Sequence, residues 1–408
     1  MKYIAAAFLF LLPWQTRLII SSGSLNGEYW EYGTISLYAI DILLIVLIAF
    51  CLFGAKPLSN KKILLPVLLI GLALANIFSS FNPALSAFHW LWMLLALALY
   101  FALKHHGFDY KKLALAFVAG AAVAGIFGVW QFSSQSAPAS KWFGLAEHQP
   151  AELGVSVIEA VAPDGVIERW LRAYGPFDHP NILGGYLALA LIIAMLLALK
   201  INPKENKPEH IILTASIIGL SAGLVASFSR GAWLAALIAI IVILIQYKNQ
   251  FKKLLPFLLI SIIVIGLFVT PYYYLFAPRL NNDSRLEQIS SSERLGGWKD
   301  SLGVVKKNLL IGSGLGTYGL ALEQTRPNEL VWFYQPVHNT FLLILAELGL
   351  IGLLLAGFLF KKLPLSILGA LVVIALFDHW LLSLHIGPLV LATVAALTAG
   401  LRRDTLIS

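Results

Sequence analysis

The sequence is dominated by long apolar stretches, each close to the length that a helix needs to cross a lipid bilayer. Such a helix needs about 20 consecutive apolar residues, and the 408-residue chain contains about twelve stretches that fit. They lie at residues 3–20, 34–54, 63–80, 84–103, 110–132, 181–199, 211–229, 231–247, 254–274, 338–360, 363–380 and 384–401. With 59% hydrophobic and 12% charged residues, the composition excludes a soluble globular protein. The sequence predicts an all-α, polytopic membrane bundle of about twelve spans.

The basic residues predict how this bundle is oriented. Placing the N-terminus in the cytoplasm puts a set of basic segments on that side, at 56–62, 104–112, 200–210, 248–253, 361–362 and 402–403. The short loops on the other side carry no Lys or Arg, which is the asymmetry that sets membrane topology. Both termini are therefore predicted to be cytoplasmic. The first stretch is read as a retained helix, because no small-residue cleavage site follows it.

Three segments remain on the outer side, at 21–33, 133–180 and 275–337. The chain thus divides into a five-span region (1–132), a periplasmic loop (133–180), spans six to nine (181–274), a large helical periplasmic loop (275–337) and a three-span region (338–408). Arginine predominates outside, at Arg169, Arg172, Arg230, Arg279, Arg285, Arg294 and Arg326. The planar guanidinium suits bidentate binding of phosphate and carboxylate. We therefore expect an outward-facing anion site.

His338 and Asn339 stand at the outer end of span ten. An imidazole with a reference pKa of about 6.5 is largely neutral and able to accept a proton from a hydroxyl. The alternative is that both residues only cap the helix. Glu347 points to the opposite face on helical spacing, so we expect it, like Asp41, to bond another span inside the bundle. Whether Asp378, beside His379, is structural or functional is left open.

Further candidates lie at the outer ends of other spans. Arg172, His179 and Asn181 lead into span six, where Pro180 and Asn181 are also ordinary helix-start residues. Arg230 lies in a tight turn between spans seven and eight, at a depth that suits a lipid phosphate or a snorkelling side chain. Arg294 and Trp298 are four residues apart and share one helix face if that segment is helical.

Several kinds of site are not indicated. Glycines 312, 314 and 316 lack the strand and the Lys-Ser/Thr pair of a nucleotide loop, so a close backbone turn is expected there. No outer loop shows Asp-x-Asp or acids with His at ligand spacing, which argues against a divalent metal holding a diphosphate. The phosphate-neutralising cations would then be arginines. Arginines that neutralise a leaving diphosphate, together with a neutral base that accepts the proton of an acceptor hydroxyl, would form a minimal site for glycosyl transfer.

Taken together, these stretches resemble the O-antigen ligase and O-antigen polymerase superfamily of bacterial lipid-linked glycan transferases, and most closely the ligases. The resemblance rests on Gly-Pro-Phe-x-His-Pro-Asn-x-Leu-Gly-x-Tyr at 175–186 and Ser-Arg-Gly-Ala-Trp at 229–233. Arg294 with Trp298, and His338-Asn339 followed by Ala-Glu-Leu-Gly-Leu-Ile-Gly at 346–352, complete it. It covers about residues 172–360.

The resemblance implies a glycosyltransferase of the bacterial inner membrane whose site faces the periplasm. It would move a glycan from undecaprenyl diphosphate to an acceptor hydroxyl, without metal, nucleotide or other cofactor. Arg230 and Arg294 would bind the diphosphate, with Arg285 able to take the place of Arg294. His338 would act as the base or orient the acceptor. The substrate-binding residues are expected to be Arg172, His179, Asn181, Arg285, Trp298 and Asn339.

The expected partners are the membrane, the lipid-linked glycan donor and an acceptor that is a lipid A-core-like glycolipid or a glycan. No nucleic acid is expected, and the sequence does not indicate the oligomeric state. A polymerase that uses the same donor shares these motifs. A protein O-oligosaccharyltransferase would be expected to carry a further soluble C-terminal part. A transporter of the same lipid is disfavoured because most candidate groups lie at one outer face and no inverted repeat is visible.

Overall fold

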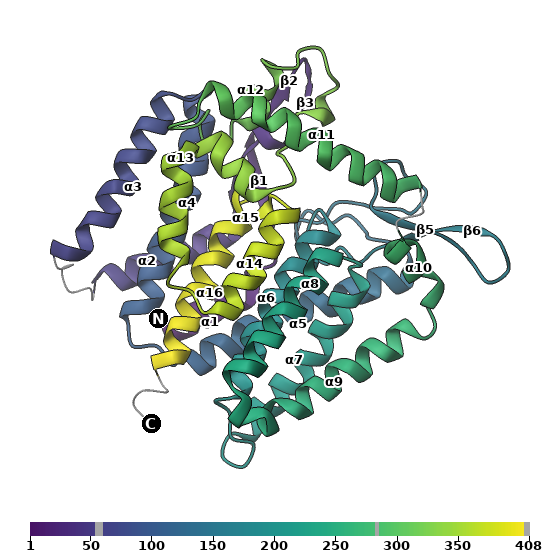
Figure 1. Ribbon diagram of the computed structural model, residues 1–408. Helices are drawn as coiled ribbons and strands as arrows, with labels where there is room; N and C mark the ends of the chain where they lie inside the picture. Colours follow the sequence, from purple (N-terminus) through teal and green to yellow (C-terminus); the bar gives the residue numbers. More distant parts are fainter. Residues whose placement is uncertain (54–59, 282–284, 404–408) are drawn as a thin grey trace.

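The computed structural model describes residues 1–53, 60–281 and 285–403 and is mostly helical (Figure 1). One main helix lies at each of the twelve predicted stretches. These helices are α1 (Lys2–Leu11), α2 (Ala39–Phe53), α3 (Asn60–Phe78), α4 (Pro83–His105), α5 (Tyr110–Ser134), α6 (Pro180–Ala198), α7 (Lys207–Ala226), α8 (Arg230–Gln246), α9 (Phe251–Val269), α13 (Thr340–Phe360), α14 (Leu365–Phe377) and α16 (Ile386–Arg403). Among the described residues, 6 helices are long and apolar enough to cross a membrane. The predicted helical membrane architecture is confirmed at this level, and the number of twelve spans stays a prediction.

The remaining elements lie at the ends of these helices. They are β1 (Arg17–Ser21), β2 (Ser24–Leu25), β3 (Glu28–Tyr29), η1 (Glu31–Gly33), β4 (Ile35–Tyr38), β5 (Val157–Val161), β6 (Ile167–Leu171), η2 (Lys248–Gln250), α10 (Tyr273–Asn281), α11 (Arg285–Lys307), α12 (Tyr318–Glu323), η3 (Val331–Phe333) and α15 (Trp380–Ser383). In Figure 1, α12, β2 and β3 lie at the top, α11 lies at the upper right, and β5 and β6 lie at the right. Of the basic loops, residues 56–59 lie outside the described residues.

The first predicted span is wrong in its second half. Helix α1 ends at Leu11, and β1 pairs in antiparallel fashion with β4, so that Arg17 faces Tyr38. Pro13 disfavours continuation of a helix because its nitrogen cannot donate the next hydrogen bond. The second predicted span likewise begins as strand β4, and its helix starts only at Ala39. The all-α prediction is thus corrected by three small two-stranded sheets.

Helix α13 is not the single uninterrupted span that the sequence predicts. The backbone breaks at Gly349, which has φ of 67° and ψ of −168°. Beyond the break, the amide of Leu350 donates to the carbonyl oxygen of Leu309 (2.8 Å) and that of Ile351 to Leu310 (3.2 Å). Segment 309–310 therefore accepts the backbone hydrogen bonds that the broken helix leaves unpaired, which an apolar environment requires.

The glycine-rich turn after this segment fits against α13, as predicted for a close backbone approach. A Cβ on Gly312 would lie 2.2 Å from the carbonyl carbon of Glu347. The Glu347 carboxylate accepts from the backbone amide of Tyr318 (3.1 Å), so its partner is this turn and not another span as predicted. Asn76 fixes the arrangement, because its amide group donates to the carbonyl oxygens of Ile311 and Glu347 at 2.8 Å each.

Helix α6 forms the centre of the main core. Its sequence is apolar on every face and nearly all of its side chains are buried, as expected of a helix surrounded by others. The adjacent Gly184 and Gly185 allow close contacts, since a Cβ on Gly184 would lie 2.7 Å from Cβ of Ser229. The predicted bond between Asp41 and another part of the bundle is confirmed, because Asp41 Oδ1 lies 2.7 Å from Nε2 of buried His385, which immediately precedes α16.

Candidate active site

His338 is held at the entrance of α13 by its neighbour. The side chain of Asn339 caps the helix, with Oδ1 accepting from the amide of Leu342 (3.0 Å). The same side chain donates through Nδ2 to the carbonyl oxygen of Leu376 at the end of α14 (3.3 Å). Both ends of the Asn339 amide are thus used within the protein. His338, one residue earlier, is half-buried, and this cap fixes the position of its backbone.

Asp378 and His379, whose role the sequence leaves open, lie beside His338. The two imidazole rings have centroids 4.9 Å apart. The hydroxyl of Thr340 donates to the carbonyl oxygen of Asp378 (2.7 Å), which ties the start of α13 to the end of α14. The only signal in the sequence was an Asp-His dipeptide at the end of an apolar stretch. Spacing arguments miss such a cluster because it joins two distant segments.

The charges around His338 set its protonation. Burial lowers the pKa of His338, Asp378 acts to raise it and the positive charge of Arg294 lowers it further. The imidazole is therefore neutral near pH 7. Burial, together with the charge of His338, lowers the pKa of His379 to about 3. Burial acts to raise the pKa of Asp378, but the facing histidines and the backbone amide of His379 outweigh it and lower that pKa.

Arg294 occupies a half-buried position on α11, and its positive charge acts on His338. Trp298, four residues further along this helix and on the same face, is half-buried and packs against a cluster of buried side chains that includes Val304, Val305 and Tyr318. Arg285 stands at the first position of α11 and is exposed. Nine residues of helix separate it from Arg294, a rise of about 13 Å. Of these two arginines, Arg294 is the one whose charge acts on His338, and which of them contacts the diphosphate stays a prediction.

Arg230 begins α8 directly after a strained turn. Phe228 in this turn is buried and has a left-handed backbone, with φ of 47°. The guanidinium of Arg230 donates to the carbonyl oxygen of Arg279 (2.8 Å), and that of Arg279 donates to Phe228 (2.9 Å). A Cβ on Gly231 would lie 3.6 Å from that of Phe377, the last residue of α14. The start of α8 therefore packs beside the segment that carries Asp378 and His379.

Arg172, His179 and Asn181 form a linked group at the start of α6. Buried Arg172 donates from Nε to the carbonyl oxygen of Ser227 (2.9 Å) and from Nη2 to Oδ1 of Asn181 (2.7 Å). His179 caps α6 by accepting from the amide of Asn181, and its Nε2 lies 2.9 Å from Oγ of Ser156. Burial and the charge of Arg172 lower the pKa of His179 to about 3. The group fixes the Arg230 turn to α6, and its predicted contact with substrate stays a prediction.

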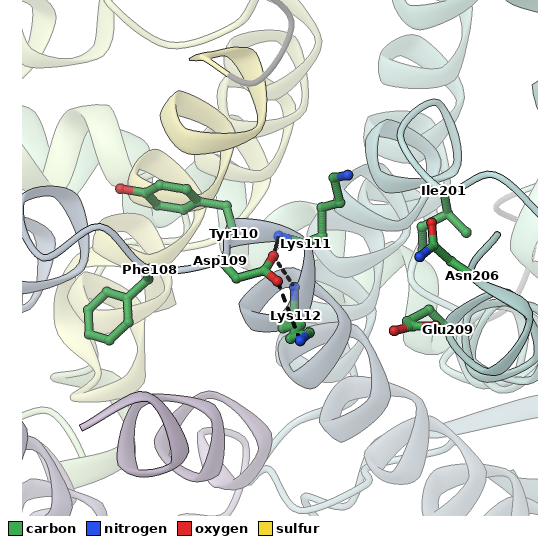
Figure 2. A pocket seen from close by; sticks show the side chains of 8 residues that line it. All are labelled: Phe108, Asp109, Tyr110, Lys111, Lys112, Ile201, Asn206 and Glu209. Atoms are coloured by element: carbon green, nitrogen blue, oxygen red, sulfur yellow. Dashed lines mark hydrogen bonds and ion pairs between the residues drawn. The ribbon is translucent and has the colours of Figure 1, made fainter. Parts of the chain in front are cut away.

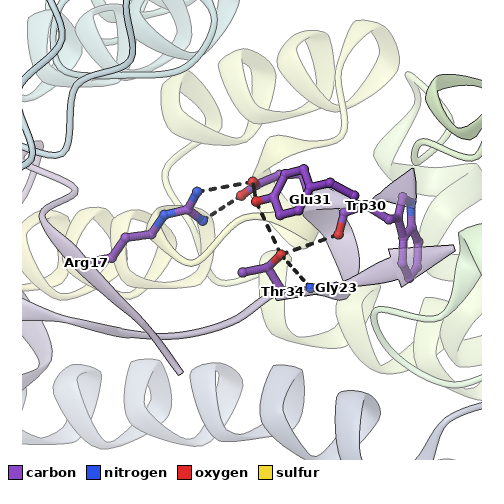
Figure 3. Close-up of polar contacts among 6 residues, drawn as sticks. Arg17, Gly23, Trp30, Glu31 and Thr34 are labelled. Carbon is purple, nitrogen blue, oxygen red and sulfur yellow. Dashed lines mark hydrogen bonds and ion pairs between the residues drawn. The ribbon is translucent and has the colours of Figure 1, made fainter. Parts of the chain in front are cut away.

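The N-terminal segment, outside the resemblance, forms part of the wall of this site. Figure 3 shows Arg17 paired with Glu31, at 2.5 and 3.1 Å between guanidinium nitrogens and carboxylate oxygens. Next to Glu31, Tyr32 places its ring edge-on to His379, with centroids 5.9 Å apart. Trp30 donates from Nε1 to the carbonyl oxygen of Tyr334 (3.0 Å). The ion pair thus holds residues 17 and 31 together within this segment, and the Trp30 bond joins the segment to Tyr334, shortly before His338.

A cavity of about 480 Å³ lies elsewhere, at the opposite ends of α6 and α7 (Figure 2). Its lining consists of Phe108, Asp109, Tyr110, Lys111, Lys112, Ile201, Asn206 and Glu209. The carboxylate of Asp109 caps α5 by accepting from the amides of Lys111 and Lys112. Because α6 has 19 residues and is about 28 Å long, this cavity is separate from the site around His338.

Comparison with known protein families gives a match to one part of the chain. Residues 212–357 match the family model described as O-Antigen ligase. The matched segment contains Arg230, Arg294 and His338, whereas Asp378 and His379 follow it. No match is found among the curated proteins. The match supports placing residues 212–357 in the O-antigen ligase superfamily.

Proposed function

We propose that the protein is a membrane glycosyltransferase of the O-antigen ligase type. It transfers a glycan from undecaprenyl diphosphate to a hydroxyl of a lipid A-core-like acceptor, at the periplasmic face of the bacterial inner membrane. Both termini lie in the cytoplasm. The reaction uses no metal ion. A polymerase reaction, in which a second lipid-linked glycan is the acceptor, is the alternative.

In the proposed step, the acceptor hydroxyl oxygen attacks the anomeric carbon of the donor sugar. The bond between that carbon and the phosphate oxygen breaks, and the diphosphate leaves with the bonding electron pair. His338 takes the hydroxyl proton as general base. The guanidinium groups of Arg294 and Arg230 neutralise the charge that develops on the leaving diphosphate. Asp378 compensates the positive charge that His338 acquires.

The observation that carries this proposal is the set of charges that faces His338. A half-buried, neutral imidazole is subject to the charges of a guanidinium on α11 and a carboxylate at the end of α14. A base needs to be neutral before it accepts a proton, and the carboxylate stabilises it afterwards. The start of α8, with Arg230, packs against the end of α14, which supports a second cation at the same place.

The direct experiment is transfer by purified protein in lipid nanodiscs. Undecaprenyl-diphosphate glycan and a lipid A-core acceptor are supplied in EDTA, and the product is followed by its shift on a gel. We expect acceptor-linked glycan at a steady rate. Loss of activity in EDTA that divalent metal restores would overturn the metal-free mechanism, and glycan elongation on the donor lipid would identify a polymerase.

The His338→Ala variant tests the role of the base. It should lose transfer by about 10²- to 10⁴-fold, the range typical of a general base, while still binding the donor. His148→Gln is the matched control. The His148 ring stacks on Tyr174, with 4.1 Å between ring centroids, and both residues belong to segment 133–180 rather than to the group around His338. Near-normal turnover by His338→Ala would exclude His338 as the base.

A further inference from the structure

We infer that His338, His379 and Asp378 form a binding site for a divalent transition-metal ion of the zinc type, whose occupancy blocks the transfer reaction. The inference that the metal blocks transfer rests on the proposed function, whereas binding itself does not. One nitrogen from each imidazole and one carboxylate oxygen lie within 4.8 Å of one another. Two imidazoles and one carboxylate are a common set of three protein ligands for zinc.

A hydrogen bond orients the imidazole of His379, as is usual for histidines that bind a metal ion. Nδ1 of His379 lies 2.6 Å from Oγ of Ser383, and the Ser383 hydroxyl donates to the carbonyl oxygen of His379 (3.1 Å). With the hydroxyl proton directed to that carbonyl, Nδ1 of His379 is the donor and Nε2 carries the lone pair. A second hydrogen bond of this kind orients an imidazole ligand and raises its basicity.

The carboxylate is oriented in the same way. Oδ1 of Asp378 accepts from the backbone amides of His379 (2.8 Å) and Trp380 (3.4 Å). These two contacts involve a single oxygen, so Oδ2 is available to a ligand. Asp378 is 8% exposed and His379 is 6% exposed. Both groups are therefore fixed within the protein and shielded from bulk water.

His338 supplies the third and adjustable ligand. Within the described ranges, its Nδ1 is buried and has no hydrogen-bond partner. Ligands of a tetrahedral zinc ion lie about 3.3 Å apart, given metal–ligand bonds of about 2.0 Å. The observed separation of up to 4.8 Å thus needs to close by roughly 1.5 Å, and rotation of the His338 ring toward the pair breaks no hydrogen bond of Nδ1.

The surrounding charges do not oppose a cation. Arg294 acts on His338 from α11, but Glu293 and Asp378 act on it with the opposite sign. A bound ion would occupy a lone pair of His338. The same imidazole then cannot accept the proton of an acceptor hydroxyl, so metal binding and transfer exclude each other.

The test measures metal binding and transfer separately on the full chain. Protein purified with a tag that contains no histidine is freed of metal with EDTA, which is then removed, and titrated with Co²⁺ or Zn²⁺ alone. Binding is read from the visible absorption of Co²⁺ and from competition of Zn²⁺ with a chromophoric chelator. We expect one ion per chain, and Zn²⁺ should stop transfer over the same concentration range in which it binds. Added EDTA should restore the rate.

Variants assign the ion to this site among the nine histidines of the chain. Asp378→Asn keeps an oxygen for the two backbone amides and removes the charged ligand, so it should fold and weaken binding by at least about tenfold. Ser383→Ala should weaken binding by about 10- to 100-fold through His379. His148→Gln should bind as the unmodified protein does. Equal binding by all variants would overturn the site. Full transfer by the Zn²⁺-loaded protein would overturn the blocking role, whereas metal binding without any transfer in EDTA would contradict only the proposed function.

Discussion

The side chains around His338 come from three separate parts of the chain. Asp378 and His379 follow α14, Arg294 lies on α11, and His179 caps α6 and acts electrostatically on Asp378. None of these residues is near His338 in sequence. A sequence reader can recognise His338, Arg230 and Arg294 because motifs surround them. Asp378 and His379 become recognisable only when the Thr340 bond joins α13 to the end of α14.

The two candidate arginines of α11 should differ sharply in their effect on activity. Arg294→Ala should reduce the transfer rate by about 10²- to 10³-fold, because it removes a cation next to the leaving diphosphate. Arg285→Ala should retain most of the rate, since Arg285 is exposed and stands at the first position of the helix, nine residues before Arg294. Initial rates at saturating acceptor measure both. A larger loss for Arg285→Ala would show that Arg285 contacts the diphosphate instead.

Asn339 offers a test between helix capping and substrate binding. Asn339→Asp keeps the oxygen that accepts from the Leu342 amide but loses the donor to the Leu376 carbonyl oxygen, so it should keep the cap and activity within a few-fold at a somewhat lower stability. Asn339→Ala loses the cap and should lower stability by about 1 kcal/mol. Thermal unfolding in detergent and transfer rates distinguish the roles. If Asn339→Asp abolished transfer at unchanged stability, the amide would be a substrate ligand.

At the scale of the element, α6 determines how closely the parts of the site approach. A Cβ on Gly185 would lie 2.9 Å from Cζ2 of Trp380, a fully buried ring that follows Asp378 and His379 directly. Gly184 admits the Ser229 side chain in the turn before Arg230. The paired glycines therefore let α6 pack against both segments at once.

Gly185→Ala should disturb the site without touching any of its ionisable groups. The added methyl overpacks the contact with Trp380, at a cost of about 1–3 kcal/mol, and shifts the segment that carries Asp378. We expect a lower melting temperature and a reduced transfer rate. Gly266→Ala in α9 is the matched control, because a Cβ there meets nothing within 4 Å. Equal behaviour of the two variants would argue against a role for this close contact.

The helices were predictable because the requirement for long apolar runs acts locally. Where the structure departs from prediction, the cause is a partner segment elsewhere in the chain. Residues 17–21 form a strand because 35–38 lie beside them, and α13 breaks at Gly349 because segment 309–310 accepts its hydrogen bonds. Glu347 likewise bonds Tyr318 in the glycine-rich turn. The local pattern of apolar residues does not indicate which distant segment packs beside a given stretch.

At the scale of the whole molecule, the lysine-rich loops and the candidate site lie at opposite ends of the helices, which agrees with the proposed orientation in the membrane. The lysine-rich loops 200–210 and 248–253 lie at the ends of α6, α7, α8 and α9 that are farthest from the candidate site. The clustered ionisable groups and β5–β6 lie toward the other ends of these helices. The topology rule expects lysine on the cytoplasmic side, so the proposed cytoplasmic location of these loops is consistent with the proposed periplasmic location of the site.

This orientation can be tested with one pair of matched substitutions. The only cysteine, Cys51, is buried, so a Cys51→Ala background removes it with little change to the surface. Pro163 in the β5–β6 turn and Pro203 in the α6–α7 loop are both exposed. In intact cells with a permeabilised outer membrane, a membrane-impermeant maleimide should label Pro163→Cys and leave Pro203→Cys unlabelled until the inner membrane is broken. The reverse pattern would place the candidate site in the cytoplasm, where a lipid-linked donor on the periplasmic leaflet cannot reach it.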